Sequence, residues 1–164
     1  MTGVDTIRTA LQSTQHLVTW FLSDLSDADL LVRAAPGANH IAWQLGHLIV
    51  AEGRLASGQL PEAQYPELPA GFARQHGKET QATDPPAGFA TRAEYIDLFT
   101  KARQATLAAL GKLTDADLDR PNTGNMAPFA PTLGALLLLV SNHSLMHAGQ
   151  FSVVRRKLGK PVLF

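Results

Sequence analysis

Two histidines in the C-terminal part of the chain have the spacing of metal ligands. His143 and His147 lie in the stretch SNHSLMHAGQ, inside an apolar run over residues 131–159 that has the period of a helix. Side chains four residues apart lie on one face of a helix, one turn from each other. Two imidazoles placed in this way can supply half of a tetrahedral zinc site, although a pair on a helix surface or in a core can also occur without metal.

His47 is the natural third ligand. It lies in the segment WQLGHL, among apolar residues and directly after Gly46. A glycine inside a helix costs about 1 kcal/mol relative to alanine, which is tolerable where another group must approach the backbone. The residues that precede His143 are almost all apolar, so the imidazoles are expected to be buried. A buried imidazole without a partner costs about 1–3 kcal/mol, and a shared cation removes that cost.

Three neutral imidazoles leave at least one coordination position open, which is typical of a catalytic metal. Zinc is the first expectation for three nitrogen ligands, and nickel or iron is compatible with them. A metal of this kind lowers the pKa of a bound water or thiol, or polarises a carbonyl. The sequence predicts no other catalytic residue.

Three further residues are candidates for the substrate pocket or for support of the ligands. His40 precedes His47 by two helical turns, about 10 Å along the axis, where it would meet a substrate or face solvent. Trp43 lies between them and is expected in the core or the pocket wall. Gln150 follows His143 by seven residues and could orient a ligand or water, or bond a neighbouring helix.

Other polar residues are not assigned a role. Glu52 is five residues after His47, roughly 140° around the helix, and is therefore not proposed as a general base. His16 and His76 lack supporting context and are expected to face solvent. The sequence contains no convincing Ser-His-Asp arrangement or phosphate loop.

Four amphipathic helices must position these residues. Apolar periodicity predicts helices over residues 4–25, 39–58, 91–113 and 131–159. Asn39 is the expected N-cap of the second helix, Thr91 and Glu94 form a capping box for the third, and Pro131 suits the first turn of the fourth. The basic residues at positions 155–157 are expected to interact with the negative end of the last helix.

The chain divides into two similar halves. The phrase L-[S/T]-D-A-D-L occurs at residues 25–30 and again at residues 113–118, each time between a helix and a histidine-bearing helix. Residues 57–90 join the halves and have no sustained period, with prolines at Pro61, Pro66, Pro69, Pro85 and Pro86. We therefore predict an all-α fold, a four-helix bundle with a long crossover between helices two and three. The whole chain, residues 1–164, is expected to form one domain.

Composition restricts the class of protein. The chain is 45% hydrophobic and 17% charged, has 14 basic and 14 acidic residues, and contains no cysteine. Balanced charge argues against nucleic acid as a partner. The longest apolar run is too short for a membrane span, which needs about 20 residues, and the start of the sequence does not have the pattern of a signal peptide. A cytoplasmic location is expected, since the lack of cysteine fits a reducing compartment.

The motifs together resemble those of the DinB-like superfamily, a group of metal-dependent helical bundles. The resemblance rests on L-G-H-L in the second helix, H-S-L-M-H-A-G-Q in the fourth, a basic stretch with Leu-Gly after it, and the phrase L-[S/T]-D-A-D-L, and it covers nearly the whole chain. It implies a four-helix bundle with a long crossover and a metal triad of His47, His143 and His147. It also implies a homodimer, and in some members a transferase or isomerase that uses a low-molecular-weight thiol.

Two functions of different class follow. The first is a metal-dependent enzyme, a thiol-dependent S-transferase or a hydrolase, that acts on a small molecule. The second is a non-catalytic bundle that dimerises or binds a small ligand, with a structural or vestigial metal. A bundle whose histidines meet by chance is the remaining reading.

Overall fold

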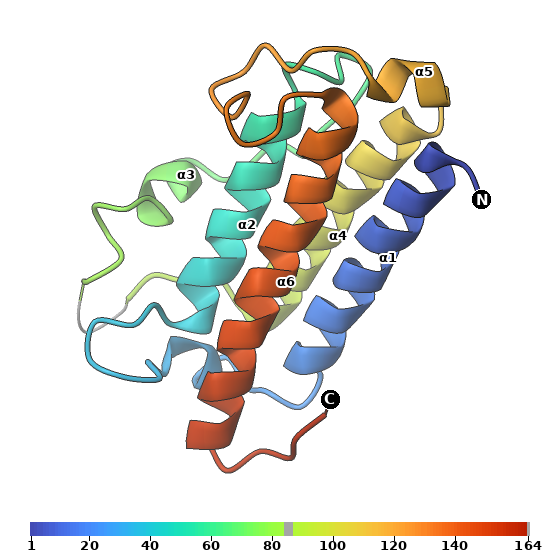
Figure 1. The fold of residues 1–164 in the computed structure, drawn as a ribbon. Helices are drawn as coiled ribbons and strands as arrows, with labels where there is room; N and C mark the ends of the chain where they lie inside the picture. Colours follow the sequence, from blue (N-terminus) through green and yellow to red (C-terminus); the bar gives the residue numbers. More distant parts are fainter. Residues whose placement is uncertain (84–86, 164) are drawn as a thin grey trace.

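Four long helices form a bundle, as the sequence predicts (Figure 1). The computed structural model describes residues 1–83 and 87–163, and within them it contains no β-strand, only an isolated bridge between Pro121 and Thr132. The long helices are α1 (Gly3–Leu22), α2 (Ile41–Ala56), α4 (Arg92–Leu110) and α6 (Leu133–Lys157). Three short elements, η1 (Asp29–Leu31), α3 (Phe72–Gln75) and α5 (Asp115–Leu118), lie between them.

The direction of the helices explains the long crossover. In Figure 1, α1 and α6 run one way and α2 and α4 the other. Because α2 and α4 are parallel neighbours, the chain must return along the length of α2, about 24 Å, before α4 can begin. The segment that returns contains α3 and passes along the outside of α2. Helix α2 also packs against α6, so the two histidine-bearing helices are neighbours.

Helix boundaries follow the expected cap chemistry, with two corrections. Thr91 and Glu94 form the predicted capping box of α4. Asn39 is not the N-cap of α2: His40 has the extended backbone of a cap, and its Nδ1 accepts a hydrogen bond from the backbone N–H of Trp43. Helix α6 begins after Thr132, whose hydroxyl caps it, so Pro131 lies before the helix rather than in its first turn. Helices α1, α4 and α6 are each two or three residues shorter at the C-terminal end than predicted.

The repeated phrase has the same structure in both halves. The backbone N–H of Ser26 bonds the Asp29 carboxylate, and the N–H of Asp29 bonds the Ser26 hydroxyl. Thr114 and Asp117 form the same kind of capping box at the start of α5. Both copies therefore turn the chain after a long helix by the same local hydrogen bonds.

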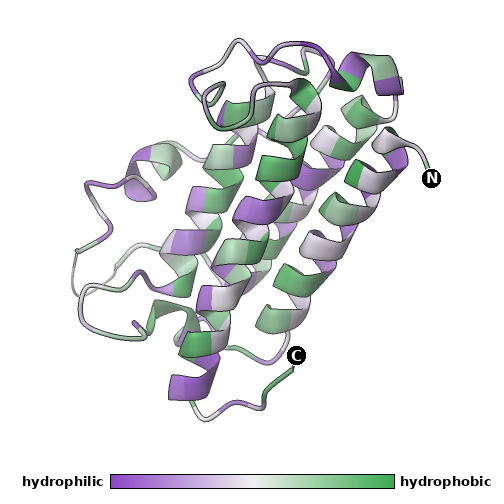
Figure 2. Ribbon diagram, viewed as in Figure 1, coloured by the Kyte–Doolittle hydropathy of each residue, from purple (hydrophilic) through white to green (hydrophobic). Residues whose placement is uncertain are grey.

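The core is apolar at both ends of the bundle and polar at its middle. Two clusters of buried apolar side chains, mainly leucine, isoleucine, valine and aromatic residues, fill the interior. The hydrophobic residues of the long helices are drawn in green in Figure 2. Between the two clusters, the Arg103 guanidinium is fully buried and bonds both carboxylate oxygens of Glu52 at 2.9–3.1 Å. It also donates to the Thr14 hydroxyl, the Leu11 carbonyl and the Ser144 hydroxyl. This network connects all four long helices.

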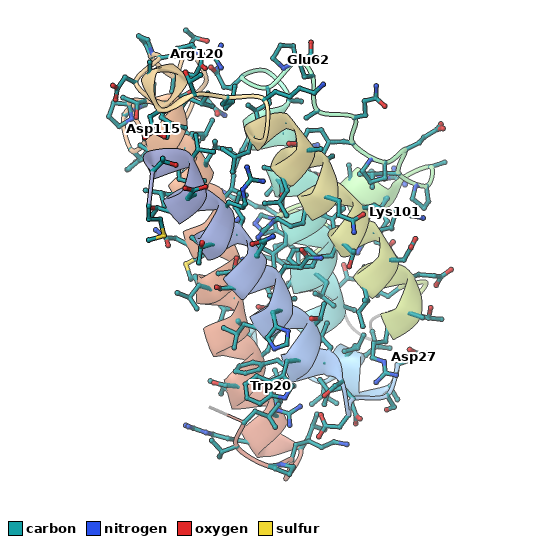
Figure 3. The ribbon with its side chains drawn as sticks, turned by 90° about the vertical axis from the view of Figure 1, so that its right-hand side faces the viewer. Trp20, Asp27, Glu62, Lys101, Asp115 and Arg120 are labelled. Atoms are coloured by element: carbon teal, nitrogen blue, oxygen red, sulfur yellow. The ribbon has the colours of Figure 1, made fainter. Side chains whose placement is uncertain are left out.

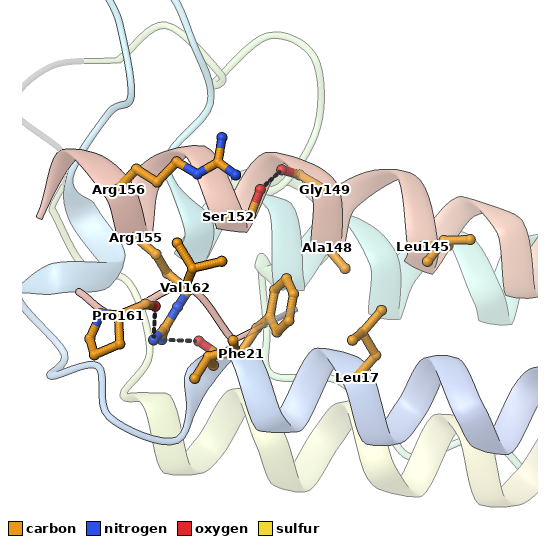
Figure 4. Close-up of a pocket in the computed structure, with 11 residues that line it drawn as sticks. Leu17, Phe21, Leu145, Ala148, Gly149, Ser152, Arg155, Arg156, Pro161 and Val162 are labelled. Atoms are coloured by element: carbon orange, nitrogen blue, oxygen red, sulfur yellow. Dashed lines mark hydrogen bonds between the residues drawn. The ribbon is translucent and has the colours of Figure 1, made fainter. Parts of the chain in front are cut away.

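Arg155 does more than interact with the end of α6. Its side chain is buried, pairs with Asp24 after α1, and donates to the carbonyls of Phe21 and Pro161 (Figure 4). A hollow of about 210 Å³ lies beside it, between α1, α6 and the residues that follow α6. Arg155 therefore also joins α6 to the end of α1, a contact that was not predicted from the sequence.

Pro85 and Pro86 lie outside the described residues, as does Phe164, so the prediction of one domain over residues 1–164 is not tested. Within residues 1–83 and 87–163, no helix combines the length and apolar character that a membrane crossing requires.

Candidate metal centre

Three imidazoles from two helices converge at the middle of the bundle. His47 of α2 faces His143 and His147 of α6, which lie one turn apart. Nε2 of His143 lies 3.3 Å from Nε2 of His47 and 3.2 Å from Nε2 of His147. One ligand atom from each of the three lies within 4.8 Å of the others. Two nitrogens at 2.0–2.1 Å from a tetrahedral zinc are about 3.3–3.4 Å apart, so the arrangement fits a divalent ion.

Hydrogen bonds on the far side of the rings direct the lone pairs toward this common point. Nδ1 of His147 lies 2.8 Å from Oε1 of Gln44. The Gln44 amide is oriented by its Nε2, which donates to the Asn39 carbonyl at 2.7 Å, so its oxygen must face the histidine. Nδ1 of His147 therefore carries the proton, and Nε2 presents a lone pair. The backbone of His76 acts to raise the pKa of His47, against the larger effect of burial.

Burial keeps the three rings neutral. Desolvation lowers the pKa of His143 to about 4 and that of His147 to about 3, and the neighbouring imidazoles contribute in the same direction. The pKa of His47 is also lowered, mainly by burial. Neutral imidazole is the form that binds a metal, so these ligands do not need to lose a proton at pH 7.

Trp43 holds His47 in place. The two rings stack with centroids 5.0 Å apart and an interplanar angle of 7°. The buried indole N–H of Trp43 donates to the carbonyl of Gly77 in the crossover segment. Trp43 is thus part of the core behind the ligand, one of the two places the sequence predicts for it.

A cavity adjoins two of the three histidines. Its volume is about 470 Å³, within the range of small-molecule sites. It lies between α2, α6, the residues after α3 and the loop before α6. The lining includes His47 and His143 together with His76, Arg54, Lys78 and Met126. A ligand in this cavity would reach the point on which the imidazoles converge.

Comparison with known proteins agrees with this geometry. The sequence matches the family model of the DinB superfamily over residues 10–151, which is most of the chain. The chain belongs to the DinB superfamily. No curated protein matches the sequence.

Two solved structures are similar in fold to this DinB chain. A conserved protein from Enterococcus faecalis has a TM-score of 0.70 and 19% identity, with 98% of this chain and 99% of that chain covered. YfiT from Bacillus subtilis has a TM-score of 0.68 and 18% identity, with 96% and 89% covered. YfiT is described as "a probable metal-dependent hydrolase with an unusual four-helix bundle topology". At these identities the likeness shows the fold.

Two of the residues predicted to assist the three histidines do not lie beside them. His40 is buried at the start of α2, where it caps the helix and contacts the ring of Phe89 edge-on, and it does not line the cavity beside the triad. Gln150 is exposed on α6. The amide that orients a ligand belongs to Gln44, which the sequence analysis did not single out. Its position three residues before His47 in an otherwise apolar stretch is the signal that could have found it.

His76 was expected to face solvent, and that prediction is wrong. Its side chain is only 2% exposed. Nδ1 donates to the carbonyl of Phe72 and Nε2 accepts from the hydroxyl of Tyr95, both at 2.7 Å. The ring lies against the backbone of Gly46, where an added Cβ would be 2.1–2.3 Å from its atoms. The glycine before His47 does accommodate a close approach, and the group that approaches is His76.

Replacing Gly46 with alanine is expected to destabilise the protein by about 1–3 kcal/mol, because the His76 ring must move from α2. This cost outweighs the gain of about 1 kcal/mol in helix propensity. Urea unfolding measures the change. Gly53→Ala is the matched control on the same helix: its Cβ would meet only Tyr65, at 3.9 Å, so stability should be unchanged or higher. Equal effects of the two substitutions would contradict the role of His76.

Replacing Gln44 with leucine is expected to weaken zinc binding by roughly 10–100-fold, the usual effect of removing a group that orients a ligand. Calorimetric titration with zinc measures the change. Gln150→Leu is the control, because this exposed residue on α6 should have no effect. If Gln150→Leu weakened zinc binding and Gln44→Leu did not, the orienting residue would be Gln150, as the sequence predicts.

Proposed function

We propose that this protein is a metal-dependent enzyme that uses a divalent ion held by His47, His143 and His147, and that zinc is the ion, ahead of nickel or iron. The convergence of three Nε2 atoms beside a cavity is the observation that carries the proposal. The description of YfiT as a probable metal-dependent hydrolase supports it. A bound ion would supply charge that lowers the pKa of a coordinated water or thiol.

The residues of the chain have defined tasks in such a reaction. Gln44 would orient His147, and the Trp43 ring, which stacks on His47, would restrict rotation of that imidazole. Apolar side chains of α2 and α6, among them Val50 and Leu139, line the cavity and would contact an apolar part of a substrate.

The cavity favours a thiol over water as the nucleophile. Among its described lining residues none is a carboxylate, and Nε2 of His76 is engaged by Tyr95. The described lining residues therefore offer no obvious general base. A thiol, with a pKa of about 8.5, becomes anionic without a base far more readily than water does. We therefore place S-transfer from a low-molecular-weight thiol to a small electrophile first, and hydrolysis second.

Elemental analysis of protein purified without a histidine tag tests the metal, with titrations of zinc, nickel and ferrous iron. We expect about one ion per chain. The metal-loaded protein should then consume thiol in the presence of at least one of a panel of electrophiles, and removal of the metal should stop the reaction. A protein that contains no ion and binds none would overturn the proposal.

The alternative is a non-catalytic bundle with a structural or vestigial metal. It shares the three-histidine site but requires no turnover. A metal-loaded protein that consumes no thiol and hydrolyses no ester or amide across the panel would favour it.

We infer a small-molecule substrate from the cavity volume, and neither nucleic acid nor a membrane as partner from the balanced charge and the lack of a long apolar run. A homodimer is supported by exposed apolar side chains on α1 and α6, among them Trp20 and Leu145, which line one groove. Sedimentation equilibrium would measure the oligomeric state. A cytoplasmic location fits the lack of cysteine.

A further inference from the structure

We propose that the cavity beside the three histidines binds a small anionic molecule, whose carboxylate, sulfonate or phosphate group is held by Arg54 and Lys78. The inference rests on the proposed function, because the same ligand would present its reacting atom to the metal. It adds the charge of the ligand and the residues that recognise it.

Among the described residues that line the cavity, the charged ones are both basic. Arg54 and Lys78 both line it, and among the described lining residues there is no aspartate or glutamate. Neither cation forms a salt bridge or side-chain hydrogen bond in the described parts of the chain. A divalent ion on three neutral imidazoles would add two further positive charges. A neutral ligand would leave this charge uncompensated, whereas an anion would balance part of it.

The two cations come from different elements and face the same space. Arg54 follows His47 by seven residues on α2, hence on the same face and about 10 Å along the axis. Lys78 follows Gly77, whose carbonyl accepts the indole N–H of Trp43, so the backbone beside Lys78 is fixed to α2.

The rest of the lining indicates the shape of the ligand. Val50, Leu55, Met126 and Leu139 form apolar walls between the imidazoles and the cations. His47, Arg54 and Lys78 line the same cavity, so one small ligand could present its reacting atom to the imidazoles and its acidic group to the cations. A short, partly apolar chain with the reactive atom at one end and an anionic group at the other fits this arrangement.

Two thiols that differ in charge test the inference on cobalt-loaded protein. The probes are 2-mercaptoethanesulfonate and 2-mercaptoethanol, which share the same thiol and two-carbon chain. Cobalt–thiolate absorption reports binding of either. We expect the sulfonate to bind roughly 10–100-fold more tightly, as for one charge-assisted contact or more, and its advantage to shrink at high salt.

The double substitution R54Q/K78Q should remove most of that advantage, because it should weaken binding of the sulfonate far more than binding of 2-mercaptoethanol. The control is K101Q/K112Q, which removes the same charge from exposed side chains away from the cavity (Lys101 is labelled in Figure 3). Circular dichroism checks that each variant is folded.

Each other outcome has a defined meaning. Equal affinities for the two thiols would overturn the inference, and so would absence of binding by both. If the sulfonate still binds more tightly than 2-mercaptoethanol in R54Q/K78Q, the advantage comes from the metal and not from Arg54 and Lys78. That result would also overturn the inference. Failure of the protein to take up cobalt at all would instead overturn the proposed function, and this inference with it.

Discussion

Replacement of His143 with alanine is expected to abolish stoichiometric zinc binding. Nε2 of His143 lies within 3.3 Å of Nε2 of both His47 and His147. The substitution therefore removes the nitrogen atom that lies next to the other two. The loss should exceed the roughly 10–100-fold expected for a residue that only orients a ligand. Calorimetric titration with zinc, followed by elemental analysis after dialysis, measures it.

His16→Ala is the matched control, because His16 is an exposed histidine on α1 far from the triad in the sequence. It should bind zinc as the unsubstituted protein does. Without metal, the His143→Ala protein should remain folded, since this side chain is partly exposed and supports no core contact comparable to Arg103. Undiminished zinc binding by His143→Ala would show that the three imidazoles do not form one site.

Replacement of Arg103 with methionine is expected to lower the free energy of unfolding by about 3–5 kcal/mol. The substitution fills a similar volume but leaves the Glu52 carboxylate buried without its ion partner, and this uncompensated charge is the main cost. It also removes donors from Thr14, Ser144 and the Leu11 carbonyl. Chemical unfolding followed by circular dichroism measures the change.

The double variant Arg103→Met with Glu52→Gln should recover part of that loss, since the amide carries no charge. Lys101→Met on the same helix is the surface control and should change stability by less than about 0.5 kcal/mol, because its pair with Asp97 is exposed. A cost for Arg103→Met as small as that for Lys101→Met would contradict a stabilising role of the network.

Features governed by neighbours in the sequence could be predicted. The four helices, the capping box at Thr91 and the facing pair His143 and His147 depend on periods of three or four residues. The placement of His47 beside them followed from the two-half pattern and from the resemblance to the DinB family, which the family match confirms. That these residues bind metal stays a prediction.

Features that depend on distant contacts could not be predicted. Arg103 and Glu52 are 51 residues apart, and His76 meets Tyr95 from a proline-rich segment without periodicity. A hint was present for Glu52, which occupies the apolar stripe of α2 with Leu45 and Leu48 and therefore requires a buried partner. The N-cap was assigned to Asn39 because asparagine is a better cap than histidine in general, whereas here His40 has the required backbone geometry.

The crossover segment lines the cavity and is bonded to Trp43, which stacks on His47, and this has a thermodynamic consequence. The carbonyl of Gly77 accepts the indole N–H of Trp43. A displacement of this segment that admitted a bulkier guest would therefore loosen the grip on the ion. Because linkage is reciprocal, loading the ion would in turn tighten the cover. In the proposed enzyme, entry of substrate and retention of metal would therefore report on a single equilibrium, so a substitution that changed one would change the other.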